Sequence, residues 1–343
     1  MRGDGLDKTV ILAVAGSGKT TRIVEEIDAQ RRFLIFTYTE QNLLNLRQKI
    51  IATHGHLPSN ITVMTYFTFL HSLCFRPIAG LKVRSTGINF DDEPPRGRFK
   101  QTQLPYYLDS SGRLYAGRIA KLLSQGEFLP EVITRIERFF DIVCVDEVQD
   151  LAGNDFNFLL HLTTAKVAML MVGDFRQHTY DTSRDGSTRG SLYDDFDQYV
   201  KQFRDAGVTV DTNTLAKSRR CSSVVCNFIT EKLSIPMQTS STREAEIVLV
   251  ETQAYADELR TRTDVVKLFY SQHYKYGCYS QNWGASKGED HYEDVCIILN
   301  KNTLAHYRKG QLNQLPPSTL NKLYVALSRS RGNVYLIPHT FFD

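Results

Sequence analysis

A short loop near the start of the chain, residues 15–21, constrains the fold more than any other feature. An apolar run, residues 10–14, leads directly into Ala-Gly-Ser-Gly-Lys-Thr-Thr, which is the order of a buried strand, a phosphate-binding loop and a helix. Glycines let backbone N–H groups face a polyphosphate, a lysine brings positive charge, and a threonine hydroxyl can ligate Mg²⁺. The first glycine of the full pattern is missing, so this loop alone also fits a glycine-rich turn before a helix.

An acidic pair at the end of a second apolar run points to the same chemistry. Residues 140–145 are strand-like, and Asp146 and Glu147 follow them directly. A nucleotide hydrolase needs one carboxylate for the Mg²⁺ shell and a neighbouring one to orient or deprotonate the attacking water. A solvated acidic turn is the alternative for an isolated pair, but a phosphate loop earlier in the chain favours the hydrolase. A third apolar run, residues 167–172, precedes Gln177, whose amide can sense a γ-phosphate.

The order of the expected elements predicts an α/β fold with a parallel sheet flanked by helices, and ligands beyond the carboxyl ends of the strands. Residues 77–113 are rich in Pro, Gly, Asp and Arg, so we expect an insertion with little regular structure there. In the first half, strands are expected at 9–14, 33–36, 61–64, 142–145 and 167–172, and helices at 21–30, 41–53, 65–74, 114–124, 130–138 and 154–162.

From about residue 211 the pattern starts again, which predicts a second, smaller α/β unit. We assign residues 1–210 to a first domain with a short insertion at about 77–139, and residues 211–343 to a second domain. A length of 343 residues is compatible with two domains. In the second half, helices are expected at 222–233, 254–269 and 318–327, and strands at 246–251, 295–299 and 333–337.

Composition argues against several other classes of protein. The six cysteines have no C-x-x-C spacing, which disfavours a zinc site and fits reduced thiols. We find no secretory signal and no apolar run of 18 residues, so we expect a cytoplasmic protein without a membrane span. A net charge of only +3 does not by itself indicate a nucleic-acid partner.

Three motifs in the second half complete a series of seven that resembles the UvrD/Rep-type branch of superfamily 1 DNA helicases. Arg220 precedes an expected helix, residues 286–288 (Ser-Lys-Gly) precede a strand, and Arg329 ends a helix. The resemblance covers roughly residues 10–337. It implies two RecA-like P-loop NTPase domains with the ATP site in the interdomain cleft, and translocation on single-stranded DNA in the 3′–5′ direction.

The resemblance also implies roles for individual residues. Catalysis is assigned to Lys19, Glu147, Gln177, Arg220 and Arg329, and Mg²⁺ to Thr20 and Asp146. The residues implied to hold ATP are Ala15, Gly16, Ser17, Gly18, Lys19, Thr20, Thr21, Arg22, Gln177, Arg220, Gly288 and Arg329. Those implied to contact the nucleic acid are Thr37, Tyr38, Thr39, Thr65, Tyr66, Tyr180, Ser286 and Lys287.

Departures from the family pattern keep a second function open. The adenine-reading glutamine segment has no clear counterpart, residues 181–183 replace the usual base-stacking tryptophan, and 227–281 leaves no room for a large insertion. These features fit an ATP-gated switch or assembly subunit that partners a nuclease or another effector, as compact relatives in phage-defence modules do. A degenerate, inactive ATPase is a third alternative. The intact set of polar and charged site residues argues against it.

Overall fold

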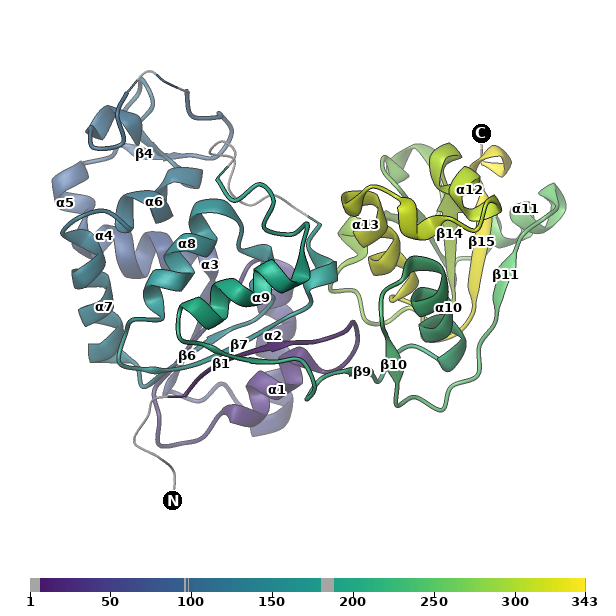
Figure 1. The fold of residues 1–343 in the computed structure, drawn as a ribbon, viewed down its shortest axis with the longest axis horizontal. Helices are drawn as coiled ribbons and strands as arrows, with labels where there is room; N and C mark the ends of the chain where they lie inside the picture. The colour runs from purple at the N-terminus through teal and green to yellow at the C-terminus, as the bar shows by residue number, and fades with distance from the viewer. Residues whose placement is uncertain (1–6, 96, 98, 180–187, 343) are drawn as a thin grey trace. The chain divides into compact units, whose positions relative to one another are not determined.

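The computed structural model describes residues 7–95, 97, 99–179 and 188–342, and the chain divides into two compact units (Figure 1). Unit 1 consists of Met1–Leu12, Thr20–Gly173 and Tyr180–Asp211. Unit 2 consists of Ala13–Lys19, Asp174–Thr179 and Thr212–Asp343. Two short segments from within residues 1–210, Ala13–Lys19 and Asp174–Thr179, therefore pack with the C-terminal part of the chain. The assignment of domains to 1–210 and 211–343 stays a prediction.

Unit 1 is built on a parallel six-stranded sheet with the order β3-β2-β6-β7-β1-β8. Every residue of β2 and β6 is buried, as expected of parallel strands covered on both faces. The strands are β1 (Lys8–Leu12), β2 (Phe33–Thr37), β3 (Ile61–Thr65), β6 (Ile142–Val145), β7 (Ala168–Gly173) and β8 (Thr209–Asp211). The longer helices are α1 (Lys19–Glu26), α2 (Glu40–His54), α7 (Phe128–Phe139), α8 (Gly153–Leu162) and α9 (Phe196–Asp205).

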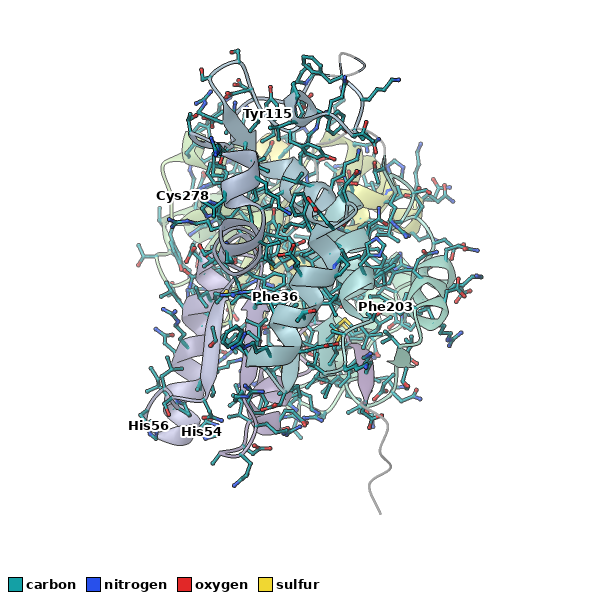
Figure 2. All side chains as sticks on the ribbon, turned by 90° about the vertical axis from the view of Figure 1, so that its left-hand side faces the viewer. Phe36, His54, His56, Tyr115, Phe203 and Cys278 are labelled. Atoms are coloured by element: carbon teal, nitrogen blue, oxygen red, sulfur yellow. The ribbon has the colours of Figure 1, made fainter. Side chains whose placement is uncertain are left out.

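An aromatic cluster forms part of the core of unit 1. The ring of Phe36 (Figure 2) is fully buried and stacks on Phe69 with a centroid distance of 4.6 Å. Phe69 begins a π-helical stretch, Phe69–Phe75, between α3 (Tyr66–Thr68) and α4 (Arg76–Ile78). The expected helix at 65–74 is therefore present, and it widens into a π-helix where these rings pack.

The segment expected to lack regular structure contains several short elements. Strand β4 (Gly87–Asn89) pairs in parallel with β5 (Arg113–Tyr115), and α5 (Gly80–Val83) precedes them. The α-helix expected at 114–124 was wrong in its first half, because residues 114 and 115 join β5 and residues 116–118 form a short 3-10 helix. The α-helix α6 (Ile119–Leu123) starts only after them. This pairing links positions 26 residues apart in the register Gly87↔Arg113, which local patterns do not reveal.

Unit 2 contains a parallel five-stranded sheet with the order β11-β15-β14-β12-β13. One apolar core lies under α10 and α13, and a second includes Leu259 and Phe342. The strands are β11 (Ile247–Leu249), β12 (Val266–Phe269), β13 (Ser280–Asn282), β14 (Val295–Leu299) and β15 (Val334–Pro338). The helices are α10 (Ser223–Leu233), α11 (Gln253–Thr261), α12 (Lys301–Arg308) and α13 (Pro317–Leu327).

The helix expected at 254–269 was wrong at its C-terminal end. The helix α11 ends at Thr261, and the following residues form β12. β12 is fully buried and pairs on one side with β14 and on the other with β13. Burial on both sides of the sheet favours the extended conformation of Val266 and its neighbours over a helix.

The predicted fold class is confirmed: both units have parallel sheets flanked by helices. Two expected strands, 142–145 and 295–299, have the observed bounds. Within the part of the chain that the structure describes, no helix is both long and apolar enough to cross a membrane. All six cysteines are free thiols.

Candidate nucleotide site

In unit 1, the start of α1 and the end of β6 bring a hydroxyl and a carboxylate together. Thr20 Oγ1 donates a 2.9 Å hydrogen bond to Asp146 Oδ2. Asp146 is only 3% exposed, and its backbone N–H donates to the carbonyl of Phe36 at 3.0 Å. A threonine hydroxyl and an aspartate are oxygen ligands of the kind that Mg²⁺ takes beside nucleotide phosphates, so the pair fits the predicted metal site.

No larger metal cluster exists among the residues covered by the structure. Groups of three or more His, Cys, Asp or Glu side chains with metal-binding geometry are absent from them. Mg²⁺ usually binds through one or two carboxylates together with substrate phosphates and waters. A single buried aspartate with a hydroxyl neighbour is compatible with that mode of binding.

Glu147 follows Asp146 in a left-handed backbone conformation, with φ 57° and ψ 49°. The Asp146 carboxylate accepts a 3.0 Å hydrogen bond from the Glu147 N–H. Gln149 Nε2 donates a 2.5 Å hydrogen bond to Glu147 Oε2. Backbone and side chain of Glu147 are thus held by separate neighbours, at the carboxyl end of β6.

In unit 2, the phosphate loop packs against the residues that precede α10. Gly16 and Gly18 have φ of 69° and 99°, a region that favours glycine. The Gly16 carbonyl accepts a 2.9 Å hydrogen bond from the Arg219 N–H, and a Cβ on Gly16 would lie 2.7 Å from Arg220 Cβ. The glycine is required here by backbone conformation and by the closeness of Arg220.

A buried tyrosine connects this loop to the segment that follows β7. The Ala15 N–H donates to Tyr324 Oη at 2.9 Å, and Tyr324 Oη donates to Asp174 Oδ2 at 2.8 Å. Burial and the nearby Asp174 charge raise the pKa of Tyr324 well above its usual value, so the phenol stays neutral and remains a donor. Sequence reasoning missed Tyr324 as a site residue, although it lies five residues before the predicted Arg329.

Two polar atoms near this network have no hydrogen bond among the described residues. Ser17 Oγ in the loop and Gln177 Nε2 after β7 are both buried and unpartnered. Buried polar groups are normally satisfied, so such atoms are suited to a ligand. Both residues belong to the predicted ATP-binding set, and their free polar atoms fit a polyphosphate.

The two predicted arginines converge on one carboxylate in unit 2. Arg220 pairs with Asp290 and donates through Nη1 to the Ser328 carbonyl at 2.8 Å. Arg329 Nη1 lies 3.7 Å from Asp290 Oδ1, and its side chain is only 3% exposed. The structure therefore brings Arg220 and Arg329 together. It also places the guanidinium of Arg219, which the sequence reasoning missed, 3.6 Å from a Cβ built on Gly18.

The residues predicted around the second motif of the second half, Ser286, Lys287 and Gly288, also lie in unit 2. Lys287 Nζ donates to the Gln177 carbonyl at 3.2 Å. Ser286 is buried and its hydroxyl donates to the Trp283 carbonyl at 2.7 Å. Gly288 has a φ of 88°, which permits the turn after Lys287. Lys287 and Gln177, predicted for different ligands, are therefore neighbours.

The predicted nucleic-acid residues of unit 1 lie at the ends of β2 and β3. Thr39 caps α2 by accepting from the Asn42 N–H, and Thr65 caps α3. Thr37 is buried, and its Oγ1 has no hydrogen bond among the described residues. Tyr38 lies beside Tyr66, with ring centroids 6.5 Å apart.

Tyr66 is 3% exposed and its hydroxyl donates to Asp155 at 3.3 Å, so its ring offers no open face. The remaining predicted ATP-binding residues lie on α1. Lys19 is buried at the start of α1, Thr21 follows in the first turn, and Arg22 forms a 2.9 Å ion pair with Glu26. Tyr180 and residues 181–183 lie outside the described part of the chain.

The known proteins to which this chain is similar are helicases. The family described as viral superfamily 1 RNA helicase core domain matches residues 122–337, more than half of the chain, in a region that begins after the phosphate loop. No curated protein matches the sequence. The crystal structure of the arterivirus nonstructural protein 10 helicase has a TM-score of 0.50 and 15% identity, and the match covers 96% of this chain and 59% of that one.

Two further solved structures match more weakly. The PRRSV helicase has a TM-score of 0.48 and 14% identity, covering 98% of this chain and 54% of its own. The arterivirus nonstructural protein 10 helicase in complex with DNA has a TM-score of 0.48 and 14% identity, covering 96% and 60%. The chain thus spans less than two thirds of the length of these helicases, and identities this low speak for the fold alone.

Proposed function

Because the chain belongs to the family of viral superfamily 1 RNA helicase core domains, we propose that it is an ATP-dependent helicase or translocase on single-stranded nucleic acid. The proposal includes Mg-ATP as the fuel, DNA as the strand, 3′–5′ polarity and the UvrD/Rep-type branch of the superfamily. The observation that carries it is the hydrogen bond between Thr20 and Asp146. It joins the loop hydroxyl to the strand-end carboxylate, the two oxygen ligands that a nucleotide-bound Mg²⁺ needs.

The proposed mechanism assigns a role to each predicted catalytic residue. Thr20 and Asp146 would hold Mg²⁺, which would supply charge neutralisation to the phosphates. Loop N–H groups and Lys19 bind the phosphates, and Glu147 orients or deprotonates the attacking water. Arg220 and Arg329 stabilise the charge that develops in the transition state, an effect worth roughly 10³- to 10⁵-fold in turnover for such arginines.

Coupling to a strand follows from the same residues. Hydrolysis changes the charge of the bound nucleotide, and a change of ligand can shift a protein between conformations with different affinity for a strand. A bound single strand would then be moved in steps. We propose Thr37, Tyr38, Thr39 and Thr65 for strand contact in unit 1, and Ser286 and Lys287 for contact in unit 2.

One observation favours the second candidate function, an ATP-gated switch that partners an effector such as a nuclease. Tyr66 is buried with its hydroxyl bonded to Asp155, and the hydroxyls of Thr39 and Thr65 cap helices. These groups already have partners within unit 1, so fewer hydrogen-bonding groups and ring faces are left to contact a nucleic-acid strand. A switch needs the nucleotide site but not a continuous strand-binding surface.

Steady-state hydrolysis of ATP separates the two functions. We would measure the wild type and Glu147→Gln with no nucleic acid, with a DNA oligonucleotide and with the equivalent RNA, at two salt concentrations. If a strand stimulates hydrolysis and Glu147→Gln abolishes that stimulation, the helicase or translocase function is supported. The strand that stimulates more strongly, DNA or RNA, then identifies the substrate. Hydrolysis that depends on Glu147 but ignores both strands supports the switch. Absence of hydrolysis by the wild type under all conditions contradicts both.

A further inference from the structure

We infer that Gln149 is a positioning residue that holds the carboxylate of Glu147, and that Gly173 keeps the space this requires. The inference rests on the proposed function, because Glu147 is the residue proposed to activate water. All three residues lie in unit 1, where the neighbouring parallel strands β6 and β7 end. Gln149 follows β6 by four positions, and Gly173 is the last residue of β7.

The first argument is the backbone of Glu147. Its φ of 57° places the backbone in the left-handed region, where non-glycine residues are uncommon. Such strain persists only where surrounding groups hold the residue, and it gathers at functional sites. The Asp146 carboxylate holds the Glu147 N–H at 3.0 Å, but that contact fixes only the backbone. A second group is needed to fix the carboxylate.

Gln149 supplies that second group. Its side chain is 0% exposed, and Nε2 lies 2.5 Å from Glu147 Oε2, while Glu147 itself is half-buried. A fully buried amide keeps one orientation because its donors and acceptors must stay paired. An amide also suits a carboxylate that works as a base, since a lysine or arginine would add a full positive charge and weaken its basicity.

Gly173 explains how the amide reaches this position. A Cβ on residue 173 would lie 2.5 Å from Gln149 Oε1 and 2.7 Å from Val148 Cγ1. The φ of Gly173 is outside the left-handed region, so alanine suits the backbone and only the space is restricted. An alanine at this position must therefore push the Gln149 side chain, and the hydrogen bond to Glu147, out of place.

The test separates chemistry from binding. Gln149→Met keeps the volume and removes the donor, and Gln149→Glu keeps the shape but places a second carboxylate beside Glu147. Both variants, and Gly173→Ala, are expected to lower kcat about 10- to 100-fold, the effect of a displaced catalytic group. KM for ATP and the affinity for a fluorescent ATP analogue are expected to stay within twofold of wild type. Matched controls are Gln198→Met and Gly80→Ala, which are expected to change neither parameter.

A double-mutant cycle shows whether Gln149 acts through Glu147. In single-turnover measurements, Gln149→Met is expected to cause no further loss in the Glu147→Gln background, because residues that act as a unit are not additive. Full additivity overturns the inference, and so does a wild-type kcat in Gln149→Met when Glu147→Gln lowers kcat. A rise in the KM of Gln149→Met for ATP that is as large as the fall in its kcat also overturns the inference. If the wild type does not hydrolyse ATP, or Glu147→Gln hydrolyses it as fast as the wild type, the proposed function fails and the inference fails with it.

Discussion

The hydroxyl of Tyr324 donates a 2.8 Å hydrogen bond to the carboxylate of Asp174, 150 residues earlier in the chain. The same oxygen accepts the N–H of Ala15, at the first residue of the phosphate loop. Tyr324 and Asp174 are 1% and 3% exposed, so water cannot replace either partner. The loop that is proposed to bind phosphate is thereby fixed to α13 and to the segment after β7.

Removal of this hydroxyl should destabilise the protein. In Tyr324→Phe, the Ala15 N–H and the Asp174 carboxylate both lose a buried partner, which costs about 1–3 kcal/mol for an unsatisfied group. The melting temperature should fall by about 2–4 °C for each kcal/mol lost. Differential scanning fluorimetry measures it, with Tyr274→Phe as the control because Tyr274 is 71% exposed. Equal melting temperatures for the two variants would contradict the role of the network.

Thr20→Val should raise the Mg²⁺ concentration needed for half-maximal ATP hydrolysis. Valine keeps the shape of threonine but removes the hydroxyl that donates to Asp146, and with it one proposed oxygen ligand. A Mg²⁺ titration at fixed ATP measures the shift, which is expected to exceed tenfold, about 1.4 kcal/mol. Thr134→Val is the control, since Thr134 is exposed on α7. An unchanged titration curve for Thr20→Val would show that Thr20 is not a Mg²⁺ ligand.

In both units, local patterns predicted some strands well and others poorly, for a physical reason. Strands 142–145 and 295–299 are short apolar runs buried on both faces, so their hydrophobicity alone defines them. β12 and β5 depend on partners distant in sequence. Their residues read as continuations of helices until those partners are known, and the pairing overrides the local preference.

The candidate site shows the same division. The loop, Asp146 and the two arginines carry charges or glycines whose chemistry is visible in the sequence, and the structure brings Thr20 to Asp146 and Arg220 to Arg329. Gln149 and Tyr324 act through neutral hydrogen bonds, which depend on geometry rather than residue type. The sequence contains both residues inside recognisable motifs, but no pattern states which partner each one contacts.

A cluster around Asp109 should make stability depend on pH. Burial raises the pKa of Asp109, but hydrogen bonds from Arg113, Asn89 and Ser111 outweigh it and lower the pKa to about 2. An unfolded aspartate has a pKa of about 3.9, so the unfolded state binds more protons between these values. The stabilisation is therefore complete above about pH 4 and is lost as the pH falls toward 2.

The variant that tests this is Asp109→Asn. Its melting temperature should lie below that of wild type by a constant amount between pH 5 and 7, and the gap should close as the pH is lowered below 4. Asp257→Asn, at an exposed position on α11, should show no such convergence. A gap that widens in acid would mean that the Asp109 carboxylate is not the stabilising form.

Asp290→Asn should tighten ATP binding. In unit 2 the carboxylate pairs with both Arg220 and Arg329, which are proposed to bind phosphate, so a nucleotide must compete with it. The Asp290 side chain is 50% exposed. Solvent screening limits the free energy that such an ion pair contributes to about 1 kcal/mol. KM for ATP should therefore fall by up to about fivefold with kcat within twofold, and the fall should diminish at high salt. Asp264→Asn, which removes a carboxylate paired with Arg262 on the surface, is the control. A rise in KM would instead show that Asp290 holds the two arginines in place for the nucleotide.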